Sequence, residues 1–394
     1  MQHFLTNSPW NDQRVVEQVT QDANALLGGY DDSCLIIDES GIPKKGDKSV
    51  GVSRQWCGQL GKTDNCQVGV YSVLCHGEHV APIGYRLFLP QCWINDEERC
   101  KLAGIPEEYI EFQTKPELAV QLVIEARGQG AEFQWVGTDA LYGNSPAFTR
   151  MLNQMHETFM VDVSKSQRIY LEDPDPVVPP AKSNKGCRPS KLKAQCAPIR
   201  IDEWVGQQPE SEWKRTCVCD ATKGNLWVDV FHQRVWLWDG EEPHAHCWHL
   251  IVRRDIGAED IKYSLSNAPE EISYKRLACM QAQRYWVERS FQDAKNQCGM
   301  GEYQARKWQS WHHHMAMVLM AMLFMVEQRI LFKDAYPLLS CFDTVCILNF
   351  LLPQRAITLK EVIRQMEVRH QRRLASIQYA YLKQLELGLS ESEP

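Results

Sequence analysis

The chain has 394 residues, of which 44% are hydrophobic, and its 43 Lys and Arg against 50 Asp and Glu give a net charge of −7. This length can bury one large core or two moderate ones, and the negative charge argues against non-specific binding of nucleic acid by the whole surface. The 15 scattered cysteines, without a signal peptide before them, predict reduced thiols and a cytoplasmic protein.

The first predicted elements are a short helix and a buried strand. Ser8 and Pro9 predict a helix start, and the helical spacing of apolar residues lasts to Gly28. The apolar run Cys34–Ile37 is typical of a strand buried on both faces, and it leaves Asp38 at the predicted strand end. A carboxylate there needs a cationic partner, so we expect either Lys44 and Lys45 or a metal ion beside it. The alternative is a simple capped turn.

A second carboxylate follows the next parallel strand. Apolar runs at 66–76 and 79–89 predict an antiparallel hairpin, and 116–129 has the spacing of a helix. The strand predicted at 133–137 then ends near Asp139. Because such crossovers are right-handed and land nearby, we expect this strand beside Cys34–Ile37, with Asp38 and Asp139 at one edge of the sheet.

The middle of the chain interrupts this pattern. A helix near 146–155 and a strand at 159–163 complete a mixed sheet, but the segment 165–200 is basic and rich in proline. Short predicted strands follow up to about residue 270, at 226–231, 235–238, 248–253 and 261–265. The sequence therefore predicts a β-rich insertion at 165–272.

Three long helices are predicted after the insertion, at 273–296, 307–332 and 359–387. The apolar stretch Met315–Val326 is shorter than the ~20 residues that span a membrane, so we expect a buried core helix and no membrane association. The last helix carries a cluster of arginines, Arg364, Arg369, Arg372 and Arg373.

The helix around Glu288 carries a third carboxylate. At about 100° per residue, Arg284 lies about 40° and Lys295 about 20° from Glu288, so all three share one face. If this face meets the sheet edge, three carboxylates converge without an imidazole, which suits Mg²⁺ or Mn²⁺, and two such ions can drive phosphodiester displacement. The alternative is an ordinary row of helical ion pairs.

Four segments resemble DDE-class insertion-sequence transposases. They are IIDESGIPKKG with Asp38, SRQWCGQLGKTDNCQVGVY from Ser53, VGTDALYG with Asp139, and RYWVERSFQDAK with Glu288. A subgroup with a β-strand insertion carries Tyr, Arg, Glu and Lys at a spacing that Arg284, Glu288 and Lys295 match. Gln281 stands at the tyrosine position, with Tyr285 as a candidate substitute. Fewer residues precede Asp38 than relatives usually carry there, which suggests an N-terminally shortened copy.

The resemblance implies an RNase H-like α/β core with flanking helices. The expected regions are an entry helix (1–33), the core in two parts (34–164 and 273–330), the insertion (165–272) and a helical C-terminal region (331–394). It implies metal-dependent cleavage and strand transfer of DNA by a homodimer assembled on transposon ends, in the cytoplasm and on the nucleoid. Asp38, Asp139 and Glu288 would be the catalytic residues and would bind two Mg²⁺ or Mn²⁺ ions.

The remaining candidate residues would contact DNA. Arg284, Lys295, Lys44 and Lys45 would bind phosphates beside the scissile bond. In related transposases DNA ends can leave through a hairpin, which requires a base to swing out and stack on an aromatic ring. The indoles expected on the insertion strands, Trp236, Trp238 and Trp248, are candidates for that ring, against the alternative of core packing.

Three other interpretations remain open. Cys217, Cys219, His244, His246, Cys247 and His249 crowd the insertion, but no paired spacing fits a zinc finger. The run His312–His314 is read as a helix surface or a row facing DNA. A transposase-derived DNA-binding protein without activity and a host nuclease of the same fold are the alternative functions.

Overall fold

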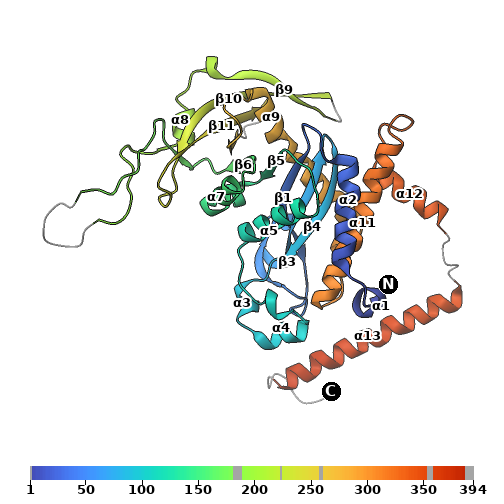
Figure 1. Ribbon diagram of the computed structural model, residues 1–394. Helices are drawn as coiled ribbons and strands as arrows, with labels where there is room; N and C mark the ends of the chain where they lie inside the picture. The colour runs from blue at the N-terminus through green and yellow to red at the C-terminus, as the bar shows by residue number, and fades with distance from the viewer. Residues whose placement is uncertain (1, 181–188, 222–223, 257–260, 353–357, 387–394) are drawn as a thin grey trace. The chain divides into compact units, whose positions relative to one another are not determined.

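The computed structural model describes residues 2–180, 189–221, 224–256, 261–352 and 358–386. The chain divides into two compact units, Met1–Cys341 and Phe342–Pro394. The first unit holds the mixed sheet and its flanking helices, and the second holds two helices (Figure 1). The finer division into regions predicted above remains a proposal.

The core sheet has the strand order of an RNase H-like fold, β4-β3-β1-β5-β6. β1 pairs antiparallel with β3 and parallel with β5, and β5 pairs parallel with β6. The strands are β1 (Cys34–Pro43), β3 (Lys62–His76), β4 (His79–Leu87), β5 (Trp135–Thr138) and β6 (Phe159–Val163). The predicted hairpin and crossover are both present. An additional strand that was not predicted, β2 (Ser53–Cys57), pairs with the start of β3.

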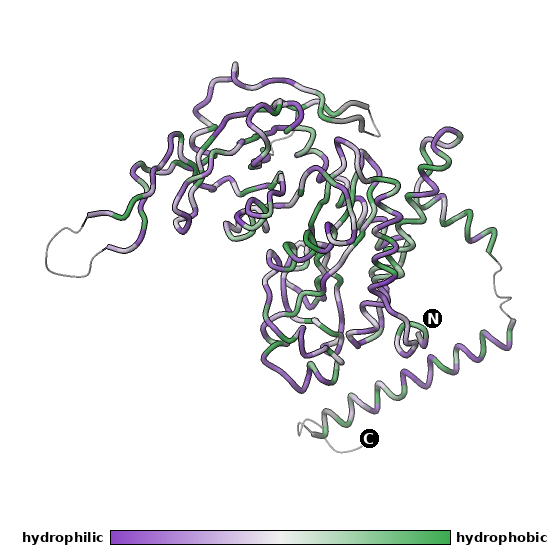
Figure 2. The backbone as a smooth tube through the Cα atoms, viewed as in Figure 1, coloured by the Kyte–Doolittle hydropathy of each residue, from purple (hydrophilic) through white to green (hydrophobic). Residues whose placement is uncertain are grey.

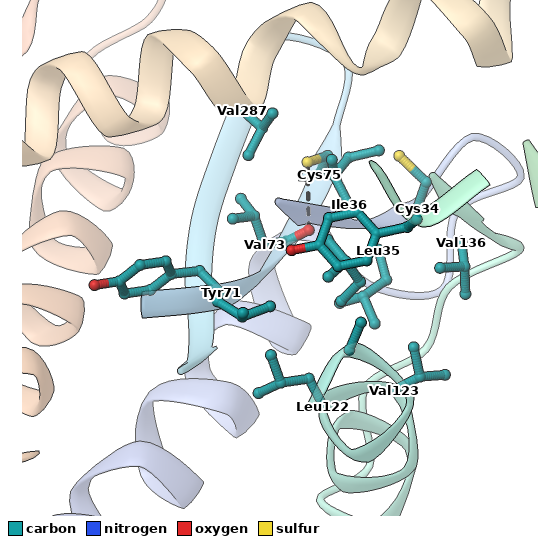
Figure 3. Close-up of a cluster of buried hydrophobic side chains, with 14 of the residues drawn as sticks. Cys34, Leu35, Ile36, Tyr71, Val73, Cys75, Leu122, Val123, Val136 and Val287 are labelled. Atoms are coloured by element: carbon teal, nitrogen blue, oxygen red, sulfur yellow. Dashed lines mark hydrogen bonds between the residues drawn. The ribbon is translucent and has the colours of Figure 1, made fainter. Parts of the chain in front are cut away.

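Helices cover both faces of this sheet. α5 (Lys115–Gly128) connects β4 to β5, and it begins at a capping box formed by Thr114 and Glu117. Leu122 and Val123 of α5 lie on one side of the buried strand β1, and Val287 of α10 lies on the other (Figure 3). Because β1 is covered on both faces, its first half is an uninterrupted apolar run.

The sequence predicted a β-rich insertion, and its strands extend the core sheet. β12 (Ile261–Ser266) pairs antiparallel with β6, and β11 (His246–Asp255), β10 (Gly224–Leu237) and β9 (Lys214–Ala221) follow in that order. β10 is one long strand where two were predicted, because the polar pair Gln233–Arg234 stays within the ladder to β11. Short elements precede them: β7 (Arg168–Ile169), β8 (Ile199–Arg200) and α8 (Ile201–Val205).

The helix that bears Glu288 is also different from the prediction. It is divided into α9 (Tyr274–Gln283) and α10 (Tyr285–Gln297), with Arg284 at the joint. Arg284 therefore starts the helix whose first turn contains Glu288.

Short helices connect other strands of the sheet. The two between β5 and β6 are α6 (Ala140–Gly143) and α7 (Pro146–Gln154), and α3 (Gln91–Ile94) and α4 (Glu97–Ala103) follow β4.

The N-terminal helices pack on α11 (Trp308–Leu331). α1 (Gln2–Asn7) ends before Ser8, and α2 (Asp12–Leu27) begins at an Asn11 cap, so the predicted start at Ser8 is wrong because the Asn11 side chain caps the helix. By length and composition α11 could cross a membrane. Trp311, Met315 and Leu319 are buried, and α11 packs against α2 and β4 as the predicted core helix.

The second unit contains α12 (Cys341–Leu351), except for its first residue, and α13 (Leu359–Glu386). Hydrophilic and hydrophobic residues alternate along α13 (Figure 2), and most of the apolar side chains that the structure describes on it are exposed.

Candidate active site

Asp38 and Asp139 lie where the parallel pairing of β1 with β5 stops. The last paired residues are Ile37 and Thr138, and each aspartate is the next residue along its chain. The prediction that Asp38 ends its strand is wrong, because β1 continues to Pro43 through its antiparallel ladder with β3. The strand β5 does end, and the two carboxylates sit together where its pairing with β1 stops.

The Asp38 carboxylate is buried among like charges. Its side chain is 13% exposed, and Oδ1 accepts a hydrogen bond from the Glu39 amide at 2.7 Å. Burial, followed by the charge of Asp139, raises the pKa of Asp38 to about 8, and Arg284 opposes this shift. A second cation at this edge would relieve the excess of negative charge.

Asp139 caps the short helix α6. Its Oδ1 accepts a hydrogen bond from the Leu141 amide at 2.9 Å, which fixes the carboxylate at the strand-to-helix turn. Burial and then the charge of Glu39 raise the pKa of Asp139. The side chain therefore belongs to the same crowded acidic region as Asp38.

Arg284 lies among three carboxylates from different elements. Its Nη1 is 3.6 Å from Asp38 Oδ2, its Nη2 is 3.2 Å from Glu288 Oε1, and its Nε is 3.0 Å from Asp162 Oδ2. Burial alone would lower the pKa of the Arg284 guanidinium, but the charges of Asp162 and Asp38 outweigh burial and raise it. The Arg284–Glu288 contact agrees with the shared helix face expected from the sequence.

Glu288 is the most accessible member of the group. Its side chain is 57% exposed and lies in the first turn of α10, where the helix dipole favours a negative charge. Within the part of the chain that the structure describes, no three His, Cys, Asp or Glu side chains are close enough to form a metal site as they stand. The Glu288 side chain would have to turn from Arg284 to join the two aspartates.

Two acidic residues near the site escaped the sequence analysis. Asp162 is the single partly exposed position of β6, and it faces Arg284. Glu39, adjacent to Asp38, accepts hydrogen bonds from Lys115 and Tyr142, each at 2.9 Å, and so ties β1 to α5 and α6. The sequence contains a signal for Asp162, because this lone carboxylate interrupts an apolar strand. Its partner, Arg284, is identifiable only from the fold.

The predicted phosphate-binding lysines have different environments. Lys295 Nζ lies 3.4 Å from the Gly41 carbonyl of β1, and burial lowers its pKa. Lys44 donates to the Tyr303 carbonyl at 2.6 Å, and burial lowers its pKa to about 8. Lys45 is exposed. Neither Lys44 nor Lys45 is an ion-pair partner of Asp38, whose cationic partner is Arg284.

The three candidate tryptophans lie on β10 and β11 or just after them. Trp248 is buried with its ring edge-to-face against Phe159 at 4.9 Å between centroids, whereas Trp236 and Trp238 are partly exposed. Trp238 and Trp248 both line a cavity of about 540 Å³, open mouth included, which also reaches Gly143 at the end of α6. The cavity thus connects the insertion to the helix that Asp139 caps.

The predicted exposed histidine row is wrong. His313 is fully buried, its ring nitrogens lie 2.9 and 3.0 Å from the Leu5 and Trp10 carbonyls, and its ring stacks on Trp10. His313 instead anchors the N-terminal segment to α11. The insertion residues considered for zinc form no metal cluster in the described residues, and His249 is buried beside His232.

Comparison with known proteins supports these observations. A family model described as DDE superfamily endonuclease matches residues 1–225, which include Asp38 and Asp139. A probable transposase for insertion sequence element IS701 from Microchaete diplosiphon is 32% identical over 174 residues, which are 43% of this chain and 42% of the relative. The chain therefore matches less than half the length of that relative.

Among solved structures, the NurA nuclease from Sulfolobus solfataricus is similar over 84% of this chain and 96% of its own, at 10% identity. The TM-score of 0.29 is too low to support an argument from that structure. The family match covers more than half of the sequence, with both aspartates of the β1–β5 edge inside it. The chain belongs to the DDE superfamily endonucleases.

Proposed function

We propose that the protein is an insertion-sequence transposase that cleaves DNA strands and joins them to target DNA with the help of divalent metal ions. The observation that carries the proposal is the concentration of Asp38, Asp139 and Glu288 around a single guanidinium, that of Arg284. The relative that is named a probable transposase supports the same class of reaction.

The donor set fits Mg²⁺ or Mn²⁺, and we propose two such ions. Asp38, Asp139 and Glu288 offer hard carboxylate oxygens without an imidazole or thiolate. Burial and Asp139 raise the pKa of Asp38 to about 8, a state that a bound cation would reverse. When bound, the ions would activate the attacking oxygen and stabilise the leaving oxygen of a phosphodiester.

The protein's own residues prepare this chemistry. The α6 turn fixes Asp139 through the Leu141 amide, and the Glu39 amide fixes one oxygen of Asp38. Arg284 and Lys295, with Lys44 and Lys45 on the adjoining segment, supply positive charge that would draw the phosphates of DNA to the carboxylates. Glu288, the exposed member, would turn to the aspartates once a cation competes with Arg284.

The insertion would hold a base removed from the stack. The cavity beside α6 is lined by Trp238 and Trp248, and one aromatic ring stabilises a stacked base by ~1–3 kcal/mol. Trp236 lies on β10, two residues before Trp238. Since Trp248 packs against Phe159, its replacement by Ala should cost about 3–5 kcal/mol of stability. Trp238 is partly exposed and donates to the Glu242 carbonyl at 2.7 Å, so its replacement should cost less stability than that of Trp248 and should stall the reaction after the first nick. A fully active W238A variant would exclude Trp238 as the ring that holds the base, and a fully active W236A variant would exclude Trp236.

The decisive experiment separates three functions. Purified protein is incubated with Mg²⁺, a DNA fragment carrying the terminal inverted repeats that flank its gene, and a target plasmid. A transposase of this kind cuts at the repeats and joins the ends to the plasmid. In the cell we propose that it acts as a homodimer on nucleoid DNA in the cytoplasm. A host nuclease cuts without joining, and an inactive DNA-binding protein binds the repeats without cutting. Either of the last two results would refute the proposal.

A further inference from the structure

Asp162 has both carboxylate oxygens engaged by protein groups. Its Oδ2 accepts from Arg284 Nε at 3.0 Å, and its Oδ1 accepts from Ser264 Oγ at 2.5 Å. The side chain is 17% exposed. A carboxylate whose two oxygens are both held in this way is suited to orienting a cationic side chain.

The partner of Asp162 comes from the insertion. Ser264 lies on β12, directly opposite Asp162 in the ladder with β6, and is fully buried. Ser264 Oγ in turn accepts from Gln281 Nε2 of α9 at 2.7 Å. The hydrogen-bonded series Gln281–Ser264–Asp162–Arg284 therefore runs from α9, through the last inserted strand, to the guanidinium in the acidic site.

The three contacts of Arg284 differ in length and in how firmly the partner side chain is held by other groups. Nε meets the fixed Asp162 at 3.0 Å, whereas Nη1 is 3.6 Å from Asp38 and Nη2 meets the exposed Glu288. If Asp38 and Glu288 turn to metal ions, the Nε contact is the one that remains. The two terminal nitrogens are then released while the guanidinium stays in place, and a planar fork of this kind matches a phosphate.

We infer that Asp162 is a positioning residue that holds Arg284 for contact with a DNA phosphate, and that Ser264 and Gln281 fix Asp162 in that role. The inference rests on the proposed function, because it takes DNA as the substrate. It also gives a role to Gln281, which occupies the position of the signature tyrosine, and to the inserted strand β12.

The test uses a change whose sign distinguishes positioning from simple charge. Asp162→Asn removes a negative charge, so electrostatics alone predicts tighter binding of DNA. Loss of a positioned arginine predicts the opposite. We expect D162N to bind a duplex oligonucleotide of the transposon end about three- to tenfold more weakly in Ca²⁺, a hard cation that the carboxylates can bind so that the terminal nitrogens of Arg284 are released. The slope of log affinity against log salt should become shallower by about one.

The Arg284→Gln background provides the second half of the test. Without the arginine, Asp162 has nothing to position, so D162N should no longer weaken binding and should strengthen it slightly. Asp229→Asn is a matched control, since Asp229 is 15% exposed and pairs with Arg215 and Arg254 in the insertion. Thermal unfolding establishes that each variant is folded. Should D162N not fold, Ser264→Ala tests the same series without a change of charge and should weaken binding in the same direction.

Binding by D162N equal to or tighter than wild type, in a protein that still cuts DNA, would overturn the inference alone. Equal weakening by D162N with and without Arg284 would also overturn it. Failure of the wild-type protein to bind or cut the DNA would overturn the proposed function as well, so the two failures are distinguishable.

Discussion

Near each end of β5 an arginine from a neighbouring helix contacts carboxylates. The balance of charge differs between the two ends, and this difference identifies the end of β5 that carries the candidate active site. Before β5, Arg127 forms two bonds of 2.8 Å with Glu157 and lies over the Phe133 ring, so one cation meets one buried anion. After β5, Arg284 faces Asp38, Asp162 and Glu288, with Asp139 nearby. The first pair is electrically balanced. The second group carries an excess of negative charge that folding does not require.

The largest expected effect is the loss of catalysis at the acidic end. Replacing Asp38 or Asp139 by Asn, or Glu288 by Gln, should reduce strand cleavage in Mg²⁺ by about a thousandfold or more. The reason is that each change removes a carboxylate needed to hold the ions, a contribution of several kcal/mol. Gel assays of nicking on end DNA measure the effect.

The matched control is Glu157→Gln at the other end of β5, which should retain cleavage in the folded fraction. Full cleavage by any of the three site variants under conditions where wild type is active would remove that residue from the proposed metal site.

The next effect concerns stability at the balanced end. Arg127→Met leaves the Glu157 carboxylate, which is 10% exposed, without its cation and should lower the free energy of unfolding by about 1–3 kcal/mol. Asp38→Asn should have the opposite sign in metal-free protein near pH 8, because it removes an excess charge. Chemical denaturation with EDTA measures both, and destabilisation by D38N would contradict the contrast between the two ends.

A further effect at the acidic end is the pH dependence of metal-free stability. The pKa of Asp38 rises from 3.8 to about 8 on folding, so the folded protein binds more protons than the unfolded chain between these values. Stability contributed by the protonated carboxyl is complete below pH 4 and is lost as the pH rises towards 8. The difference between wild type and D38N isolates this term from other titrating groups. Parallel stability curves for the two proteins would show that Asp38 does not titrate in this range.

Much of the fold follows from apolar patterns, since the hairpin, the crossover helix α5 and the strands β1, β5 and β6 were predicted near their observed positions. Local patterns did not reveal that β12 pairs with β6, because strand pairing depends on partners distant in sequence. For the same reason Asp162 was missed, while Arg284 and Glu288, which are neighbours on a helical face, were paired correctly. His313 was misread because its carbonyl partners, Leu5 and Trp10, come from the other end of the chain.

The most direct test of the central claim is calorimetric titration of metal-free protein with Mn²⁺ near pH 7, in two buffers of different ionisation enthalpy. If Asp38 is protonated in the metal-free protein and binds the ion as a carboxylate, binding should release close to one proton. D38N should bind at least about tenfold more weakly and release none. Equal affinity and equal proton release in wild type and D38N would contradict the assignment of the acidic edge as the metal site.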